Sequence, residues 1–126
     1  MGTRACIGYK MPSGKIAYVT CRFDGYLEHV GMLLAERYND FDKVLELLLG
    51  GDIVSLREDL ERTKYENPTI YEHPSDCKAK IANGIGDYLL NVEGDYKYLF
   101  DKGRWYLVEG RDDIDGISWV LLPLVA

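Results

Sequence analysis

Two arginines stand at matching ends of two adjacent predicted strands, where their charges could hold an anion. Arg4 opens the first strand and Arg22 comes near the end of the second. Paired guanidinium groups bind phosphate or carboxylate through bidentate hydrogen bonds. Thr3, Asp24 and Tyr26 lie beside them in the sequence, and a tyrosine ring can stack on a nucleotide base. We therefore predict a binding site formed by Thr3, Arg4, Arg22, Asp24 and Tyr26.

A structural role is the alternative for the same cluster. The carboxylate of Asp24 can pair with Arg4 or Arg22 and so fix the turn that leads from strand to helix. In that case the arginines stabilise the turn and need no ligand. The residue types support both interpretations, and only the arrangement in space can decide between them.

Metal binding has less support in the sequence. His73 and Cys77 form one loose pair, whereas a structural zinc site needs four ligands, usually in two close pairs. The aspartates Asp112, Asp113 and Asp115 lack the alternating spacing and the distal glutamate of a calcium loop. We expect no metal site and no cofactor.

A nucleophile held beside a base would indicate a hydrolase. Cys21 is followed by Arg22, and His29 lies beyond the next turn. A positive neighbour can lower the pKa of a thiol, but a cysteine packed inside a strand pair is the simpler interpretation. We predict no catalytic residue and a protein that acts without catalysis.

A β-hairpin is the first predicted element, and it carries both Arg4 and Arg22. Arg4–Lys10 and Ile16–Phe23 carry strand-forming residues around a Pro-Ser-Gly turn. A two-residue turn at Ser13–Gly14 would set Cys6 opposite Cys21. Because three cysteines are an odd number in a chain of this size, we expect free thiols rather than a disulfide framework.

Helical periodicity dominates the next part of the chain. Apolar residues recur at helical spacing over Leu27–Tyr38 and over Phe41–Leu49, and Asn39 or Asp40 can cap the second helix. Asp52 can cap a third, shorter helix. The middle of the chain is therefore predicted to supply two to three helices.

β-branched and aromatic residues predict a C-terminal antiparallel β-meander. Its expected strands are Tyr88–Val92, Tyr96–Phe100, Arg104–Val108 and Ile117–Leu122. Asp101–Gly103 is typical of a three-residue hairpin loop, which would set Tyr98 opposite Tyr106. Before the meander, Thr69–Tyr71 is a candidate strand and Cys77–Ala82 a candidate helical turn.

These elements predict a single α+β domain over residues 1–126, with an N-terminal β-hairpin, two to three helices and a C-terminal antiparallel β-meander. The net charge is −6, although residues 1–23 carry +4. An acidic chain argues against non-specific DNA binding, which requires many phosphate contacts. No apolar run approaches the roughly 20 residues that cross a bilayer. Because the N-terminus also lacks a secretory signal pattern, we expect a cytoplasmic protein without a membrane partner.

Several short blocks resemble a family of small phage and prophage proteins. The matching blocks are Gly2-Thr3-Arg4, Asp24-Gly25-Tyr26, Val30-Gly31, Gly51-Asp52-Ile53 and Ser55-Leu56 within residues 2–56, and more loosely Tyr96–Tyr106. The family carries a His-Trp-Asp-Gly-Tyr-Pro block, in which this chain has Arg22-Phe23 for His-Trp and Leu27 for Pro. Any role of that histidine is therefore absent here. The resemblance implies a gene of a bacteriophage or mobile element.

Two functions are compatible with these observations. The resemblance and the ten tyrosines, a residue type enriched at interfaces, favour an accessory protein that binds and modulates a host protein, such as a defence complex, in the bacterial cytoplasm. It would dock through residues 25–38 or through the aromatic meander. The basic N-terminal hairpin favours the alternative, a protein that binds a nucleotide or another small anion. A homo-oligomer is compatible with both.

Overall fold

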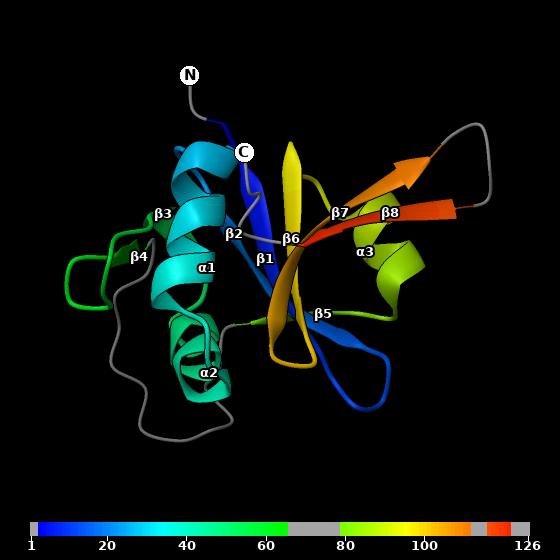
Figure 1. The fold of residues 1–126 in the computed structure, drawn as a ribbon, viewed down its shortest axis with the longest axis horizontal. Coiled ribbons are helices and arrows are strands. Elements are labelled where there is room, and N and C mark those ends of the chain that lie inside the picture. The colour runs from blue at the N-terminus through cyan, green and yellow to red at the C-terminus, as the bar shows by residue number, and fades with distance from the viewer. Residues whose placement is uncertain (1–2, 66–78, 112–115, 122–126) are drawn as a thin grey trace.

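One mixed β-sheet organises the fold in the computed structural model, which describes residues 3–65, 79–111 and 116–121. Its strands are β1 (Ala5–Lys10), β2 (Ile16–Cys21), β3 (Ile53–Ser55), β4 (Lys64–Tyr65), β5 (Lys80–Ala82), β6 (Tyr96–Asp101), β7 (Arg104–Arg111) and β8 (Gly116–Leu121). The helical segments are η1 (Leu27–Gly31), a π-helical turn that continues into α1 (Met32–Arg37), then α2 (Phe41–Leu49) and α3 (Ile85–Asn91). Figure 1 shows their arrangement.

The first strand lies in the middle of the sheet. β1 pairs antiparallel with β2 on one side and parallel with β6 on the other. The strand order is β4-β3-β2-β1-β6-β7-β8, and β5 adds a short antiparallel pairing to β2. The N-terminal hairpin and the C-terminal strands are therefore joined directly, through the β1–β6 pair.

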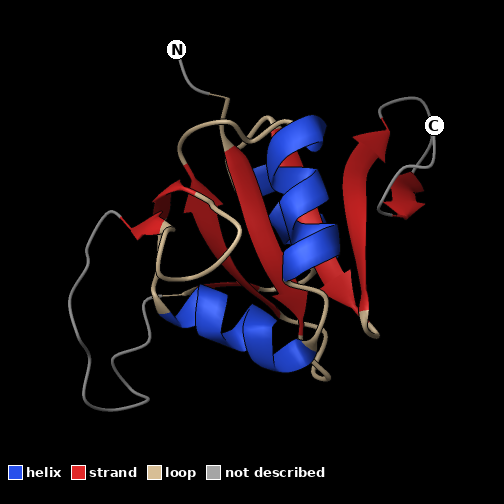
Figure 2. Ribbon diagram, turned by 60° about the vertical axis from the view of Figure 1, so that its left-hand side comes forward, coloured by secondary structure: helices blue, strands red, loops and turns tan. Residues whose placement is uncertain are grey.

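Helices cover the two faces of this sheet unequally. η1, α1 and α2 lie on one face (Figure 2), which we call the α1 face. Its buried core includes Ile7, Val19, Leu34, Leu47, Tyr98 and Trp105. The opposite face, which we call the α3 face, carries a smaller cluster that includes Cys6, Ile16, Tyr88, Leu99 and Val108. No helix in the described ranges combines the length and the apolar character required to cross a membrane.

The α+β class is confirmed, with the N-terminal hairpin, the helices and the antiparallel C-terminal strands in the predicted order. α2 has the predicted bounds because both of its determinants are local. The Asp40 carboxylate accepts a hydrogen bond from the Lys43 N–H at 2.9 Å and caps the helix. Val44, Leu47 and Leu48 recur at helical spacing and bury one side of the helix against the sheet.

The turn of the first hairpin is longer than predicted. The Met11 N–H donates to the Lys15 carbonyl at 2.9 Å, and the Gly14 N–H donates to the Met11 carbonyl at 2.9 Å. Gly14 has a φ of +92°, a left-handed conformation that glycine adopts without strain. The loop thus closes on Met11 and Lys15 rather than on a two-residue turn.

This loop shifts the predicted β1–β2 register by one residue. Cys6 pairs with Thr20, and Cys21 pairs with Ala5. A one-residue shift moves side chains to the opposite face of a sheet, so Cys6 lies on the α3 face and Cys21 on the α1 face. The prediction that the two cysteines face each other is therefore wrong, and no disulfide joins them.

The register of the β6–β7 hairpin also differs by one residue, but for the opposite reason. The predicted three-residue loop is a two-residue turn, Lys102–Gly103, with positive φ at both positions. Such a turn matches the twist of the strands it joins. Tyr98 consequently pairs with Leu107, and Tyr106 pairs with Leu99. The predicted Tyr98–Tyr106 pairing is wrong.

The segment after Asp52 is strand β3 rather than the predicted third helix. The Arg22 N–H donates to the Ile53 carbonyl at 2.9 Å, which ties this segment to the end of β2. The Asp52 carboxylate accepts a hydrogen bond from the Thr20 N–H at 3.0 Å and so does not cap a helix. Tertiary backbone pairing here outweighs the helical spacing of the apolar residues.

A helix also replaces the strand predicted over Tyr88–Val92. Near the start of α3, the Asp87 carboxylate accepts a hydrogen bond from the Asn83 N–H at 2.9 Å, and the Tyr88 N–H donates to the Gly84 carbonyl at 3.0 Å. Directly before it, strand β5 occupies part of the expected helical turn over Cys77–Ala82. Cys77 and Lys78 of that segment and the candidate strand Thr69–Tyr71 lie outside the described residues.

Candidate functional site

The turn after β2 brings the predicted site residues to one end of the sheet. The Gly25 N–H donates to the Thr3 carbonyl at 2.8 Å, and the buried Tyr98 hydroxyl donates to the Gly25 carbonyl at 2.8 Å. A Cβ on Gly25 would lie 2.7 Å from the Cβ of Ala5, so a side chain here would collide with β1. Backbone contacts and one buried tyrosine therefore fix this turn.

The position of Asp24 differs from the one that an ion pair with Arg4 or Arg22 would require. Its φ is +57°, a left-handed conformation that aspartate tolerates. Among the described residues, no ion pair joins Asp24 to Arg4 or Arg22. Tyr26 is 38% exposed and stands directly before η1, with its ring centroid 6.3 Å from that of His29. An ion pair between Asp24 and an arginine is therefore not what stabilises this turn.

Arg4 and Arg22 line one polar pocket of 320 Å³ on the α3 face, together with Tyr18 and Thr20 of β2. Lys80 lines the same pocket, because β5 pairs with β2 and sets Lys80 opposite Tyr18. We call this site, formed around Arg4, Arg22 and Lys80, the cationic pocket. The structure therefore brings together two of the five predicted site residues and adds a third cation. Thr3, Asp24 and Tyr26 lie outside its lining.

Nearby carboxylates reduce the positive charge of the cationic pocket. Asp52 Oδ2 lies 3.1 Å from Lys80 Nζ, and Asp52 Oδ1 accepts the hydrogen bond from the Thr20 N–H. Burial by itself would raise the pKa of Asp52, but these hydrogen bonds and the charge of Lys80 outweigh burial and lower the pKa. Glu93 is the one carboxylate among the lining residues. The Asp95 carboxylate also lies near Arg4, where its Oδ2 accepts a hydrogen bond from the Arg4 N–H at 3.2 Å, so three carboxylates lie near the three cations.

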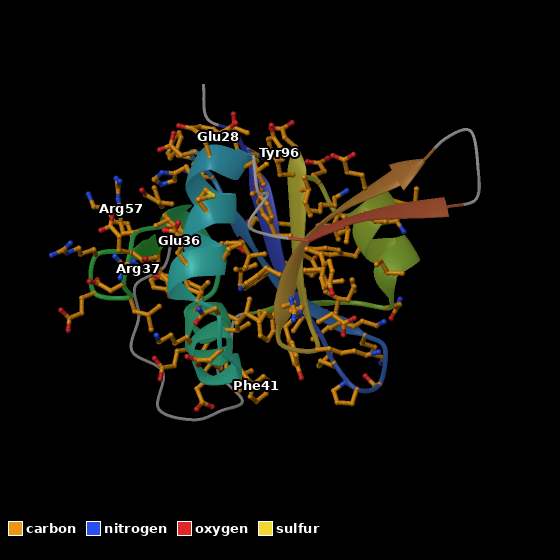
Figure 3. The ribbon with its side chains drawn as sticks, viewed as in Figure 1. Glu28, Glu36, Arg37, Phe41, Arg57 and Tyr96 are labelled. Atoms are coloured by element: carbon orange, nitrogen blue, oxygen red, sulfur yellow. The ribbon has the colours of Figure 1, made fainter. Side chains whose placement is uncertain are left out.

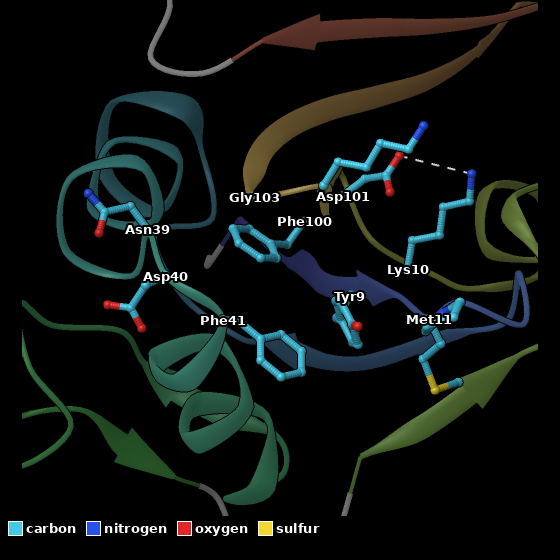
Figure 4. A pocket seen from close by; sticks show the side chains of 11 residues that line it. Tyr9, Lys10, Met11, Asn39, Asp40, Phe41, Phe100, Asp101 and Gly103 are labelled. Carbon is cyan, nitrogen blue, oxygen red and sulfur yellow. Dashed lines mark ion pairs between the residues drawn. The ribbon is translucent and has the colours of Figure 1, made fainter.

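A second pocket, of 490 Å³, opens at the other end of β1, beside the start of α2. Its apolar wall consists of the rings of Tyr9, Phe41 and Phe100 (Figure 4). The centroid of Tyr9 lies 5.2 Å from that of Phe41 and 6.4 Å from that of Phe100. β1, α2 and β6 contribute one ring each, so only the folded chain assembles this site. We call it the aromatic pocket.

Charged side chains form the rim of the aromatic pocket. Lys10 Nζ and Asp101 Oδ2 lie 4.0 Å apart at the ends of β1 and β6, as the dashed line in Figure 4 marks. Asp40 and Lys102 also line the opening. Phe41 is 46% exposed and lies at the outer end of α2 (Figure 3). The site thus combines an apolar centre with a charged margin.

A third cavity, of 600 Å³, lies between α1, α2 and the loop after β3. Its lining is mostly charged, and Figure 3 shows Glu36 and Arg37 on α1 beside it. The Tyr38 hydroxyl donates to the Arg57 carbonyl at 2.8 Å, which ties α1 to this loop. In the described part of the chain, no buried side-chain nitrogen or oxygen lacks a hydrogen-bond partner, so nothing in this cavity points to a ligand.

The described thiols are not placed for catalysis. Cys6 and Cys21 are both fully buried. Cys6 Sγ donates to the Glu93 carbonyl at 3.1 Å, and burial raises the pKa of Cys6 to about 11. Nε2 of His29 lies 3.2 Å from the Leu56 carbonyl oxygen, a contact that occupies this ring nitrogen. Because the thiolate is the reactive form, a raised pKa makes a thiol a poor nucleophile at neutral pH.

The described ranges contain no cluster of side chains that could bind a metal ion. No three His, Cys, Asp or Glu side chains there lie close enough to hold an ion. The pair His73 and Cys77 and the aspartates Asp112, Asp113 and Asp115 lie outside the described residues.

Sequence reasoning identified part of the cationic pocket but did not identify the aromatic pocket as a site. Arg4 and Arg22 were recognisable because they flank strands that pair locally. Lys80 carried no signal, since its place depends on the pairing of β5 with a strand far away in the chain. Phe41 fits the apolar spacing of its helix, and its exposure of 46% appears only in the folded structure.

Comparisons with known proteins add no assignment to this geometry. No protein-family model, no curated protein and no solved structure matches the chain. The resemblance to phage and prophage proteins stays a prediction. The function is therefore argued from the two pockets themselves.

Proposed function

We propose that this protein is a non-enzymatic accessory protein that binds a partner protein through the aromatic pocket. The observation that carries the proposal is the exposed ring of Phe41, which stands over Tyr9 in a 490 Å³ pocket with a charged rim. Binding energy in protein interfaces concentrates in a few aromatic residues, surrounded by polar contacts that exclude water. The aromatic pocket has this composition.

The shape of the site defines what the partner must present. A cavity of this size accepts one large apolar side chain, since ligand pockets begin at about 300 Å³. Lys10 and Asp101 at the rim can then form polar contacts with the backbone or with charged residues around that side chain. The partner is therefore a protein with a protruding aromatic or aliphatic residue flanked by polar groups.

A protein of the bacterial host is the partner that we propose. The support is the resemblance of residues 2–56 to phage and prophage proteins, which implies a protein that acts inside a bacterial host cell, where a defence complex is one possible target. The aromatic pocket includes the turn between β6 and β7, so docking there uses part of the predicted aromatic meander.

The test compares two exposed apolar residues. Tagged wild-type protein, Phe41→Ala and Leu90→Ala are used to capture partners from a bacterial lysate, and the captured protein is then purified for calorimetry. Leu90 is 83% exposed and lies on α3, away from the aromatic pocket, so its variant is the control. We expect Phe41→Ala to weaken binding of the purified partner about 30-fold, the effect of an interface hot spot.

Stability is measured in parallel. Because Phe41 is 46% exposed, its replacement should change the free energy of unfolding by no more than about 1 kcal/mol. A partner that binds the Phe41→Ala and Leu90→Ala variants equally well would show that the aromatic pocket is not the docking site. Failure of the wild-type protein to capture any partner would count against the proposed function.

A further inference from the structure

We propose that the residue which the partner inserts into the aromatic pocket is an aromatic one, an inference that rests on the docking function proposed above. The observation that carries it is a row of four rings that runs from the core to the surface. The ring centroids are 5.2 Å apart for Trp105 and Phe100, 6.4 Å for Phe100 and Tyr9, and 5.2 Å for Tyr9 and Phe41. Trp105 and Phe100 are each 2% exposed, whereas Phe41 is 46% exposed. The row therefore ends at the surface, in the aromatic pocket.

Neighbouring rings in this row are inclined to each other rather than stacked face to face. The angles between their planes are 57° for Trp105 and Phe100, 45° for Phe100 and Tyr9, and 60° for Tyr9 and Phe41. Aromatic rings prefer such arrangements because the positive edge of one ring then approaches the negative face of the next. A ring from the partner can continue this pattern against Tyr9 and Phe41. An aliphatic side chain cannot, since its surface carries no such charge distribution.

A methionine in the lining also suits a ring. Met11 follows β1 directly and lines the aromatic pocket together with Tyr9 and Phe41 (Figure 4). The thioether sulfur of methionine makes favourable contacts with aromatic rings, and its flexible side chain adapts to the shape of a bound group. This part of the wall therefore favours an aromatic occupant as well.

The fold holds these rings in place before a partner arrives. Tyr9 of β1 pairs with Phe100 of β6 in the parallel register, so the sheet fixes the backbone of both. Phe41 is the first residue of α2, whose start is fixed by the hydrogen bond from the Lys43 N–H to the Asp40 carboxylate. Because fixed walls lower the ordering cost of binding, a difference in ring contacts appears in the affinity.

The experiment titrates the full chain with two small probes that differ only in their ring. N-acetyl-phenylalaninamide carries an aromatic ring, and N-acetyl-cyclohexylalaninamide carries a saturated, more apolar ring of nearly the same size. NMR titration of the isotope-labelled protein gives the dissociation constant of each probe. One aromatic pair adds about two- to tenfold in affinity beyond the effect of buried area. We therefore expect the phenylalanine derivative to bind at least about threefold more tightly than the cyclohexyl derivative.

Two phenylalanine substitutions identify the ring responsible. Phe41→Leu removes a pocket ring but keeps an apolar side chain. Phe23→Leu is the matched control, because Phe23 is 41% exposed and lies outside the lining of the aromatic pocket. We expect Phe41→Leu to lose the preference for the phenylalanine derivative and Phe23→Leu to keep it. Thermal unfolding of both variants shows whether a changed preference reflects lost contacts or a lost fold.

Three results would overturn the inference. They are equal or tighter binding of the cyclohexyl derivative to wild-type protein, binding of neither probe, and an unchanged preference in Phe41→Leu. None of them decides the docking function, because a partner that inserts an aliphatic residue would still be captured and would still depend on Phe41. Conversely, a preference for the phenylalanine derivative in a protein that captures no partner would show that the docking function, and not the ring selectivity of the pocket, has failed.

Discussion

The α1 face and the α3 face are built on the same strands, yet they are covered very differently. Two helices close the α1 face over a core in which Trp105 is 2% exposed and Tyr98 is fully buried. One short helix covers the α3 face, and the cationic pocket opens beside its end. A strand pair whose two faces are both apolar must be covered by other elements on both faces. The α3 face is covered by less helix, so charged residues can lie at the margin of its core.

The two pockets follow from this difference. The aromatic pocket continues the rings of the larger core outward, from buried Phe100 to half-exposed Phe41. The cationic pocket lies where the smaller core ends and β2 carries Tyr18 and Thr20. One site therefore offers apolar surface and the other offers charge.

Two tyrosines connect the faces through one strand. The Tyr98 hydroxyl donates to the Gly25 carbonyl on the α1 face, and the Tyr88 hydroxyl of α3 donates to the Tyr98 carbonyl, each at 2.8 Å. Both hydroxyl groups are buried, and burial raises the pKa of each. The strand β6 thus anchors the helices of both layers.

The largest effect should come from Trp105→Ala on the α1 face. The change removes a buried indole and the 2.7 Å hydrogen bond from its Nε1–H to the Tyr38 carbonyl. We expect the free energy of unfolding to fall by about 3–5 kcal/mol, the usual cost of deleting a buried large aromatic side chain. Urea denaturation followed by circular dichroism measures it.

Leu90→Ala on α3 is the control for that prediction. Leu90 is 83% exposed, so its replacement should change the free energy of unfolding by about 0.5 kcal/mol or less. If Trp105→Ala were as mild as Leu90→Ala, the α1 face would not be the main source of stability, and the contrast between the two faces would be wrong.

Two Tyr→Phe substitutions, one for each face of the sheet, compare the two layers through the same chemical change. Their expected effect is smaller than that of Trp105→Ala. Tyr98→Phe and Tyr88→Phe each remove one hydroxyl and leave a backbone carbonyl without that donor. We expect each to lower the free energy of unfolding by about 1–3 kcal/mol, the cost of an unpaired buried polar group. Thermal unfolding of both variants measures the losses.

Unequal losses in the two variants would show which face of the sheet is held more firmly by its hydroxyl group. A clearly smaller loss for Tyr88→Phe would mean that α3 opens enough for water to reach the Tyr98 carbonyl. A loss near zero for both variants would contradict the assignment of these hydroxyl groups as anchors of the two layers.

The smallest effect should come from Asp52, and it should be lost in acid. Its folded-state pKa is lowered, so its ionised form stabilises the fold at pH values above the ordinary pKa of 3.8. That contribution is lost as the pH falls below 3.8 and through the lowered folded-state pKa. Asp52→Asn should therefore be less stable than wild type at neutral pH, and the difference should shrink as the pH falls through this window.

Denaturant titrations of both proteins between pH 7 and the acid range measure this difference. Glu93 and Lys80 line the same pocket and are present in both proteins, so Asp52 is the only residue that differs between them. A stability difference that is constant across the whole range would show that the Asp52 carboxylate is not held by Lys80 and Thr20 in the fold.

Sequence periodicity located most elements but not their pairing. The bounds of α2 follow from Asp40 and from local apolar spacing, and both operate within one helix. The registers of the two hairpins were each wrong by one residue, because turn length depends on which residues adopt positive φ, at Gly14 and at Lys102. Backbone angles of this kind are set partly by the strands that the turn joins.

Local spacing and turn residues were enough to predict the α+β class, the order of the main elements and the placement of Arg4 and Arg22 at one end of a strand pair. They could not show that Ile53–Ser55 is a strand, that Lys80 joins the arginines or that three rings from separate elements form one pocket. Each of these features depends on contacts between segments that are distant in the chain, and no local pattern specifies such contacts.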